Sequence, residues 1–120
     1  MGLTRVTVKV SNLTRSVEAV ETEFLVDTGA IDCMAPGKML EETGIEVEGK
    51  AFYELANGES VEYNYGFAII ELMGDRTVTQ IIFGPDNCDP ILGVVVLESI
   101  GIVVDPVSKT LKRLAAKPLK

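Results

Sequence analysis

The segment Phe24–Ala30 constrains this chain more than any other part of the sequence, because an apolar run ends there abruptly in an acid. Phe24–Val26 is typical of a buried strand, and Asp27 follows it directly. Burying an ionised carboxylate is costly unless it is paired or hydrogen-bonded, and Gly29 permits a close backbone approach. Asp27 is therefore a candidate reactive group. The alternative for this residue taken alone is an aspartate that caps a turn with its own backbone.

Length, charge and the absence of one residue type narrow the possible functions. The 120 residues predict a single domain spanning 1–120, with enough chain for one core. The net charge of -7 argues against nucleic-acid binding. The sequence has no histidine, which excludes Ser-His-Asp and Cys-His hydrolases and most zinc enzymes. Catalysis, if present, must rest on carboxylates, lysines, hydroxyls or thiols.

The sequence carries no apolar run long enough to span a bilayer and no signal-peptide pattern, so we expect a cytoplasmic protein that does not bind membranes. Cys33 and Cys88 are far apart and are expected to be free, although a disulfide between them stays open. A sparse basic tail is expected to be solvated; its members are Lys109, Lys112, Arg113, Lys117 and Lys120.

Short runs of alternating polarity separated by turn residues predict a mostly-β barrel or sandwich. Strands are expected at 3–10 and 17–26, paired as a hairpin, with 27–36 irregular. Asn57 and Gly58 form the strongest hairpin-turn dipeptide in the chain. Further extended segments are expected at 45–55, at 61–65 continuing as a strand through 66–72, and at 77–83, 102–106 and 110–114, with short helices at 37–43 and 97–101.

With these elements in order, the chain resembles the retropepsin-like aspartic proteases, the single-domain dimeric relatives of pepsin, and most of all their small prokaryotic members. Three markers carry the resemblance, which covers about residues 5–115. They are the apolar-apolar-Asp-Thr-Gly-Ala signature at Leu25–Ala30, the apolar-apolar-Gly element at Ile91–Gly93 before a short helix, and the hairpin tip Ala56–Glu59 in the place of the flap. The resemblance implies a closed acid-protease barrel, mostly β, with one or two short helices.

The resemblance also implies an activity. A two-fold axis would place Asp27 of two identical subunits side by side, so that the carboxylates share one proton and activate a water that hydrolyses a peptide bond. The expected partners are a second copy of the chain and a peptide or protein substrate. Neither a cofactor nor a metal is expected.

Individual roles follow from the same resemblance. Thr28 would lock the paired loops across the interface, Gly29 would let the strand pass close to its partner, and Ala30 would line the cleft wall. Asn57 and Gly58 would form the tip of a lid that covers the substrate and excludes water. An ordinary hairpin turn is the alternative for these two residues, and the two interpretations are compatible.

A structural supporting role is implied for Ile91, Leu92 and Gly93, with Gly93 letting two loops pack closely behind the acid. Beside the two motifs, retroviral members usually carry an aspartate and an arginine that form an ion pair. Here these positions are Ile31 and Val94. Because both charges are replaced together, no unpaired charge is left, and the expected fold is unaffected.

Two other hypotheses fit the same residues. The first is a non-proteolytic dimerisation or peptide-binding module on the same barrel, favoured by Ile31, Val94 and a tight flap tip that carries Glu59. The second is a monomer, in which Asp27 would lack a partner and the site would be silent.

Overall fold

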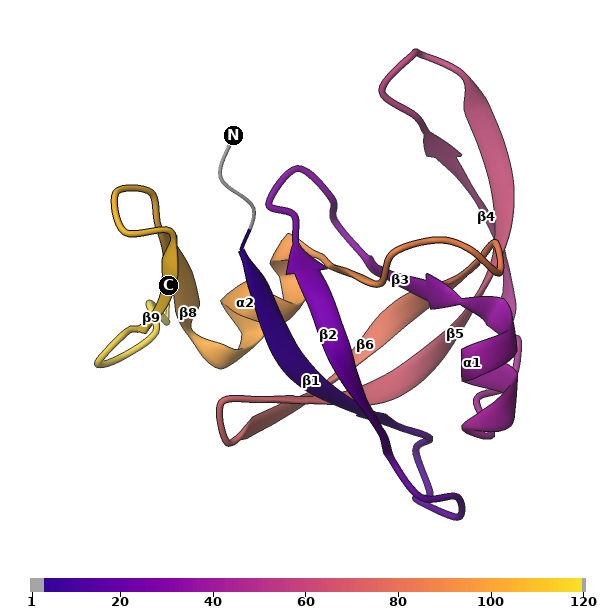
Figure 1. Ribbon diagram of the computed structural model, residues 1–120, viewed down its shortest axis with the longest axis horizontal. Coiled ribbons are helices and arrows are strands. Elements are labelled where there is room, and N and C mark those ends of the chain that lie inside the picture. Colours follow the sequence, from indigo (N-terminus) through magenta and orange to yellow (C-terminus); the bar gives the residue numbers. More distant parts are fainter. Residues whose placement is uncertain (1–3, 120) are drawn as a thin grey trace.

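The computed structural model describes residues 4–119 and confirms a mostly-β chain with two short helices (Figure 1). The strands are β1 (Arg5–Ser11), β2 (Val20–Val26), β3 (Cys33–Pro36), β4 (Gly49–Glu54), β5 (Ser60–Leu72), β6 (Asp75–Gly84), β7 (Ile91–Leu92), β8 (Ile102–Asp105) and β9 (Thr110–Arg113). The helices are α1 (Gly37–Glu42) and α2 (Val94–Ile100). Leu3 and Lys120, which the sequence placed in a strand and in the basic tail, lie outside the described residues.

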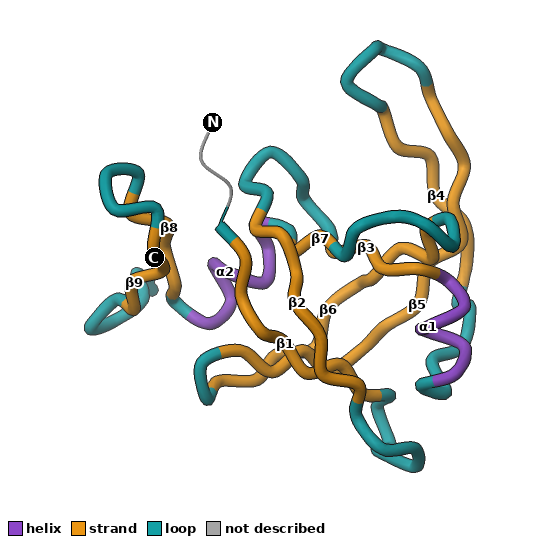
Figure 2. The backbone as a smooth tube through the Cα atoms, viewed as in Figure 1, coloured by secondary structure: helices purple, strands orange, loops and turns teal. Residues whose placement is uncertain are grey.

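Seven strands form one sheet that curls into a ring (Figure 2). Their order is β1-β2-β7-β3-β6-β5-β4, and β1 also pairs with β5, so the sheet closes on itself and leaves β4 on the outside of β5. β1 and β2 form the predicted antiparallel hairpin. The core fills the ring, and Val8 and Val10 on β1 are fully buried in it, as the alternating pattern predicts.

The prediction that residues 27–36 are irregular is wrong for the last four, which form β3. Cys33 pairs with Ile81 in a parallel register to β6, and Met34 pairs with Ile91 of β7. Both partners are distant in the sequence, and four residues are too few to display an alternating pattern. The strand therefore depends on tertiary pairing rather than on local propensity.

The helices begin and end slightly differently from the prediction. α2 begins at Val94 instead of Leu97, so it includes three consecutive valines of high β-propensity. Val96 and Leu97 are buried against the core, and this packing outweighs their local preference. α2 ends at Gly101, which has φ +74°, the left-handed conformation usual for glycine at a helix end.

The hairpin β4–β5 extends well beyond the ring, on the same side as the loop between β2 and β3 (Figure 1). Its turn is the predicted one: Gly58 has φ +89°, and its amide donates to the Leu55 carbonyl over 2.9 Å. As expected, the strand continues through Gly66, and β5 runs to Leu72. Gly66 is needed there because a Cβ would collide with the Glu46 carbonyl.

The C-terminal segment forms a separate two-stranded sheet, β8–β9, next to α2. The basic tail residues within the described part of the chain are exposed, as expected, and two of them also make contacts. Arg113 forms an ion pair with Asp75 at 2.9 Å, and the Lys117 ammonium donates to the Ser99 carbonyl at the end of α2 over 2.6 Å. Within residues 4–119, neither helix is long and apolar enough to cross a membrane.

Candidate active site

Asp27 lies where β2 leaves the ring, and β7 fixes its backbone. Leu25 and Val26 of β2 run parallel to Ile91 and Leu92 of β7. One residue further on, the Asp27 amide donates to the Leu92 carbonyl over 3.1 Å. The two predicted motifs therefore meet, and the supporting element holds the acid by its main chain.

The Asp27 carboxylate lies in a tight turn formed by its own motif. Its Oδ1 accepts a hydrogen bond from the Gly29 amide at 2.9 Å, and the Ala30 amide donates to the Asp27 carbonyl over 3.1 Å. A Cβ on Gly29 would lie 3.3 Å from that Oδ1, so glycine keeps this approach free. Asp27 therefore caps its own turn, as the alternative interpretation expected, and it also lines a cleft. Thr28, which lies between Asp27 and Gly29, is exposed.

Gly93 packs directly behind this loop. A Cβ on Gly93 would lie 2.5 Å from the Ile31 carbonyl oxygen and 2.6 Å from backbone atoms of Asp32. The first residue of α2 continues the contact, because the Val94 amide donates to the Ala30 carbonyl over 2.8 Å. The junction between β7 and α2 therefore supports the loop that carries the acid.

Cys33 lies beneath the same junction and is fully buried. The Gly93 amide donates to its Sγ over 3.5 Å. Burial is the main cause that raises the pKa of the Cys33 thiol to about 11, so the neutral thiol predominates at neutral pH and the residue is a poor nucleophile. Cys33 and Cys88 are both free, as expected.

A cleft of about 800 Å³ opens beside Asp27, between the loop that carries it and the arm of the β4–β5 hairpin. Gly29 and Ala30 line it, as do Tyr53 and Tyr63, whereas Asn57 and Gly58 are not among its lining residues. The full lining is Asp27, Gly29, Ala30, Ile31, Asp32, Met34, Phe52, Tyr53, Glu54, Leu55, Ala56, Tyr63 and Ile82. The wall is mainly apolar and aromatic, with Asp27 at one side.

The structure adds a hydrogen-bonded group that the sequence reasoning missed. The Tyr53 hydroxyl donates to Asp32 Oδ2 over 2.9 Å, and Gln80 Nε2 donates to the Tyr53 hydroxyl over 3.0 Å and lies 3.5 Å from Asp32 Oδ2. Burial and then this bond to Asp32 raise the pKa of Tyr53. The only signal in the sequence was a second acid in the same loop as Asp27.

Ile31 and Val94 replace the ion pair of the retroviral members in unequal surroundings. Ile31 lines the cleft and is 68% exposed, whereas Val94 is half-buried. In the isolated chain Ile31 and Val94 therefore do not form a buried apolar pair, and Ile31 instead offers an apolar surface in the cleft.

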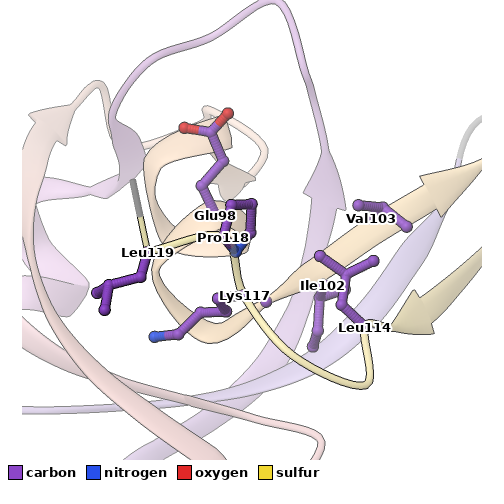
Figure 3. A pocket seen from close by; sticks show the side chains of 8 residues that line it. Glu98, Ile102, Val103, Leu114, Lys117, Pro118 and Leu119 are labelled. Carbon is purple, nitrogen blue, oxygen red and sulfur yellow. The ribbon is translucent and has the colours of Figure 1, made fainter.

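A second cavity, of about 670 Å³, shares no lining residue with this cleft and lies between the end of α2, β8 and the tail (Figure 3). Glu98 and Lys117 are its charged lining residues, and apolar side chains such as Ile102 and Leu114 form most of the rest. Within residues 4–119, no three His, Cys, Asp or Glu side chains cluster closely enough to hold a metal ion.

Comparison with solved structures identifies the fold. The EIAV protease complexed with the inhibitor HBY-793 matches with a TM-score of 0.63 and 17% identity, over 83% of this chain and 89% of that one. A retropepsin-like aspartic protease from Rickettsia conorii matches with a TM-score of 0.55 and 18% identity, over 87% of this chain and 77% of that one. The retroviral protease-like domain of Ddi1 from Leishmania major matches with a TM-score of 0.56 and 16% identity, over 96% of this chain and 92% of that one.

At the level of sequence, no family model and no curated protein matches this chain. The structural matches therefore rest on the arrangement of the elements and not on residue identity. At this level of identity they show the fold alone. The chain has a retropepsin-like fold.

Proposed function

We propose that this chain is an aspartic endopeptidase that acts as a homodimer, with Asp27 of each copy forming the catalytic pair. The observation that carries the proposal is the position of Asp27. It lies at the end of a strand of a retropepsin-like fold, held by the second motif of that fold, and it lines a cleft of about 800 Å³. A cytoplasmic location, predicted from the sequence, belongs to the same proposal.

The chemistry would follow from two carboxylates brought about 3 Å apart by a two-fold axis, since two charges that close cannot both ionise. The ionised member would take a proton from a trapped water, which attacks the peptide carbonyl. The protonated member would donate its proton to the carbonyl oxygen. The pair would titrate as a unit, so that no single pKa belongs to either carboxyl.

The surroundings of Asp27 support these roles. The Gly29 amide binds Oδ1 and orients the carboxylate, while Thr28 is exposed beside it and is free to contact a second copy. The hairpin tip at Asn57 and Gly58 directly follows Leu55 and Ala56, which line the cleft, and this supports a lid that would close over a bound peptide.

Replacing Asp27 with Asn tests the proposal. The amide has the same shape but cannot share a proton, so we expect peptide cleavage to fall by about 100- to 10,000-fold. Circular dichroism and sedimentation velocity should show an unchanged fold and assembly. Asp86→Asn, at an exposed position outside the cleft lining, is the matched control and should keep full activity. Cleavage by Asp27→Asn at the wild-type rate would contradict the mechanism.

A peptide-binding module without catalysis is the second candidate function. Two observations favour this binding function. One is the match to the Ddi1 domain. The other is the tight turn at the hairpin tip, in which the Glu59 amide donates to Asn57 Oδ1 over 2.9 Å. Tight peptide binding with no turnover between about pH 3 and 7 would identify this function, because a carboxylate pair is singly protonated somewhere in that range. Inhibition of a measurable cleavage by a pepstatin-like compound would exclude it.

A further inference from the structure

The second acid of the cleft, Asp32, has a carboxylate that is held in place but not neutralised. The Tyr53 hydroxyl and the Gln80 amide both approach its Oδ2, and both are neutral donors. Within residues 4–119, no hydrogen bond reaches its Oδ1 and no lysine or arginine forms an ion pair with it. Two side chains thus fix the direction of a negative charge that stays available to a ligand.

The rest of the cleft has the same sign of charge. Glu54 also lines it, and the described lining includes no lysine or arginine. Ile31 and Phe52 are 68% and 74% exposed, so the cleft combines uncovered apolar surface with uncompensated negative charge. A peptide that covers these apolar side chains would also remove water from Asp32.

Desolvation of Asp32 decides which peptides fit. A charge that loses its water without gaining a partner is costly, and so is the approach of a second negative charge. An ammonium or guanidinium on the peptide would instead form a charge-assisted hydrogen bond to the free Oδ1. The cost and the gain both favour a cationic side chain at this position.

We propose that Asp32, positioned by Tyr53 and Gln80, is the subsite for a lysine or arginine side chain of the bound peptide. The cleft therefore selects basic, apolar peptides over acidic ones. In a dimer each copy contributes one Asp32, which places a cation-selective subsite on each side of the scissile bond. The inference rests on the proposed function for its class of substrate, a peptide, but it concerns binding and not hydrolysis.

Binding to a catalytically silenced chain tests this subsite separately from cleavage. The probe is a mixture of acetylated decapeptides with two central leucines and with lysine, norleucine or glutamate in equal amounts at each other position. The mixture is captured on immobilised Asp27→Asn protein at pH 6, and the retained peptides are sequenced by mass spectrometry. We expect lysine to be enriched over glutamate by about 10- to 100-fold in at least one position, with norleucine between them.

Two variants in the Asp27→Asn background assign the selectivity. Asp32→Asn should remove the preference for lysine over norleucine, whereas Asp86→Asn, outside the cleft lining, should retain it. Tyr53→Phe keeps the ring but loses the hydroxyl that binds Asp32, so it should weaken the preference without abolishing it. The preference should also fall as salt is raised, more steeply than the retention of norleucine peptides.

Equal retention of lysine and glutamate peptides, retention of no peptide, or a lysine preference that survives Asp32→Asn would each overturn the inference. If the wild-type chain cleaves none of the retained peptides while the selectivity follows Asp32, the subsite stands and the proposed hydrolysis fails. The two proposals are therefore separated by a single set of proteins.

Discussion

Gly93 is a residue at which the structure leaves little room for change. A methyl group there would lie 2.5 to 2.6 Å from backbone atoms of Ile31 and Asp32, and backbone moves less readily than a side-chain tip. We expect Gly93→Ala to lower the free energy of unfolding by about 1 to 3 kcal/mol, measured by urea denaturation. Gly37→Ala is the control, because its Cβ would meet its nearest atoms at 3.4 Å, an ordinary contact. Equal effects of the two substitutions would refute this account.

Single residues could be predicted where their neighbours in the sequence determine their environment. Asp27 and Gly29 belong to one turn, so the candidate acid and the glycine beside it were identifiable from the sequence. Asp32 was not, because its donors are Tyr53 and Gln80, which are 21 and 48 positions away. The pairing of β3 with β6, and of the β4–β5 hairpin with β6, brings these three together, and no local pattern encodes that meeting.

At the scale of elements, two hairpin turns offer a matched comparison. Gly58 at the tip of β4–β5 and Gly74 at the tip of β5–β6 both have positive φ, +89° and +86°, and neither would have an atom within 4 Å of an added Cβ. Gly58→Ala and Gly74→Ala should each cost about 1 kcal/mol of stability, from backbone strain alone. Because only the first tip adjoins residues that line the cleft, Leu55 and Ala56, the proposed lid predicts that only Gly58→Ala changes kcat/KM for a peptide. An equal change in kcat/KM for both variants would argue against a lid.

Elements with strong local signals were predicted, and those that depend on distant partners were not. The β1–β2 hairpin has alternating valines and a turn, and the structure confirms it. β3 has four residues and β7 only two, and each exists because β6 or β2 offers it a hydrogen-bonding edge. The three valines that open α2 show the reverse case, in which packing of Val96 overrides a local preference for strand.

At the scale of the whole molecule, the ring accounts for the position of the acid, and one ring holds a single Asp27. Ring closure joins β1 to β5, a pairing that no turn signal in the sequence marks. It leaves Asp27 at the rim with Thr28 exposed and with Ile31 68% exposed beside it. The second Asp27 that the proposed mechanism needs can therefore come only from a second ring, and the exposed loop lies on a surface that another copy can reach.

Mixing subunits measures this dependence on a second copy. Suppose that activity needs one Asp27 from each of two chains. Refolding wild type with an equal amount of Asp27→Asn protein should then leave about a quarter of the activity shown by the same total amount of wild type. The reason is that random pairing makes only about a quarter of the dimers fully wild type. Independent active monomers would leave about half. Co-refolding with Asp86→Asn protein, whose substitution lies outside the cleft lining, should leave activity undiminished and controls for losses during refolding. Cleavage of a fluorogenic peptide, followed across the full range of mixing ratios, distinguishes a squared dependence on the wild-type fraction from a linear one, and a linear dependence would refute the shared site.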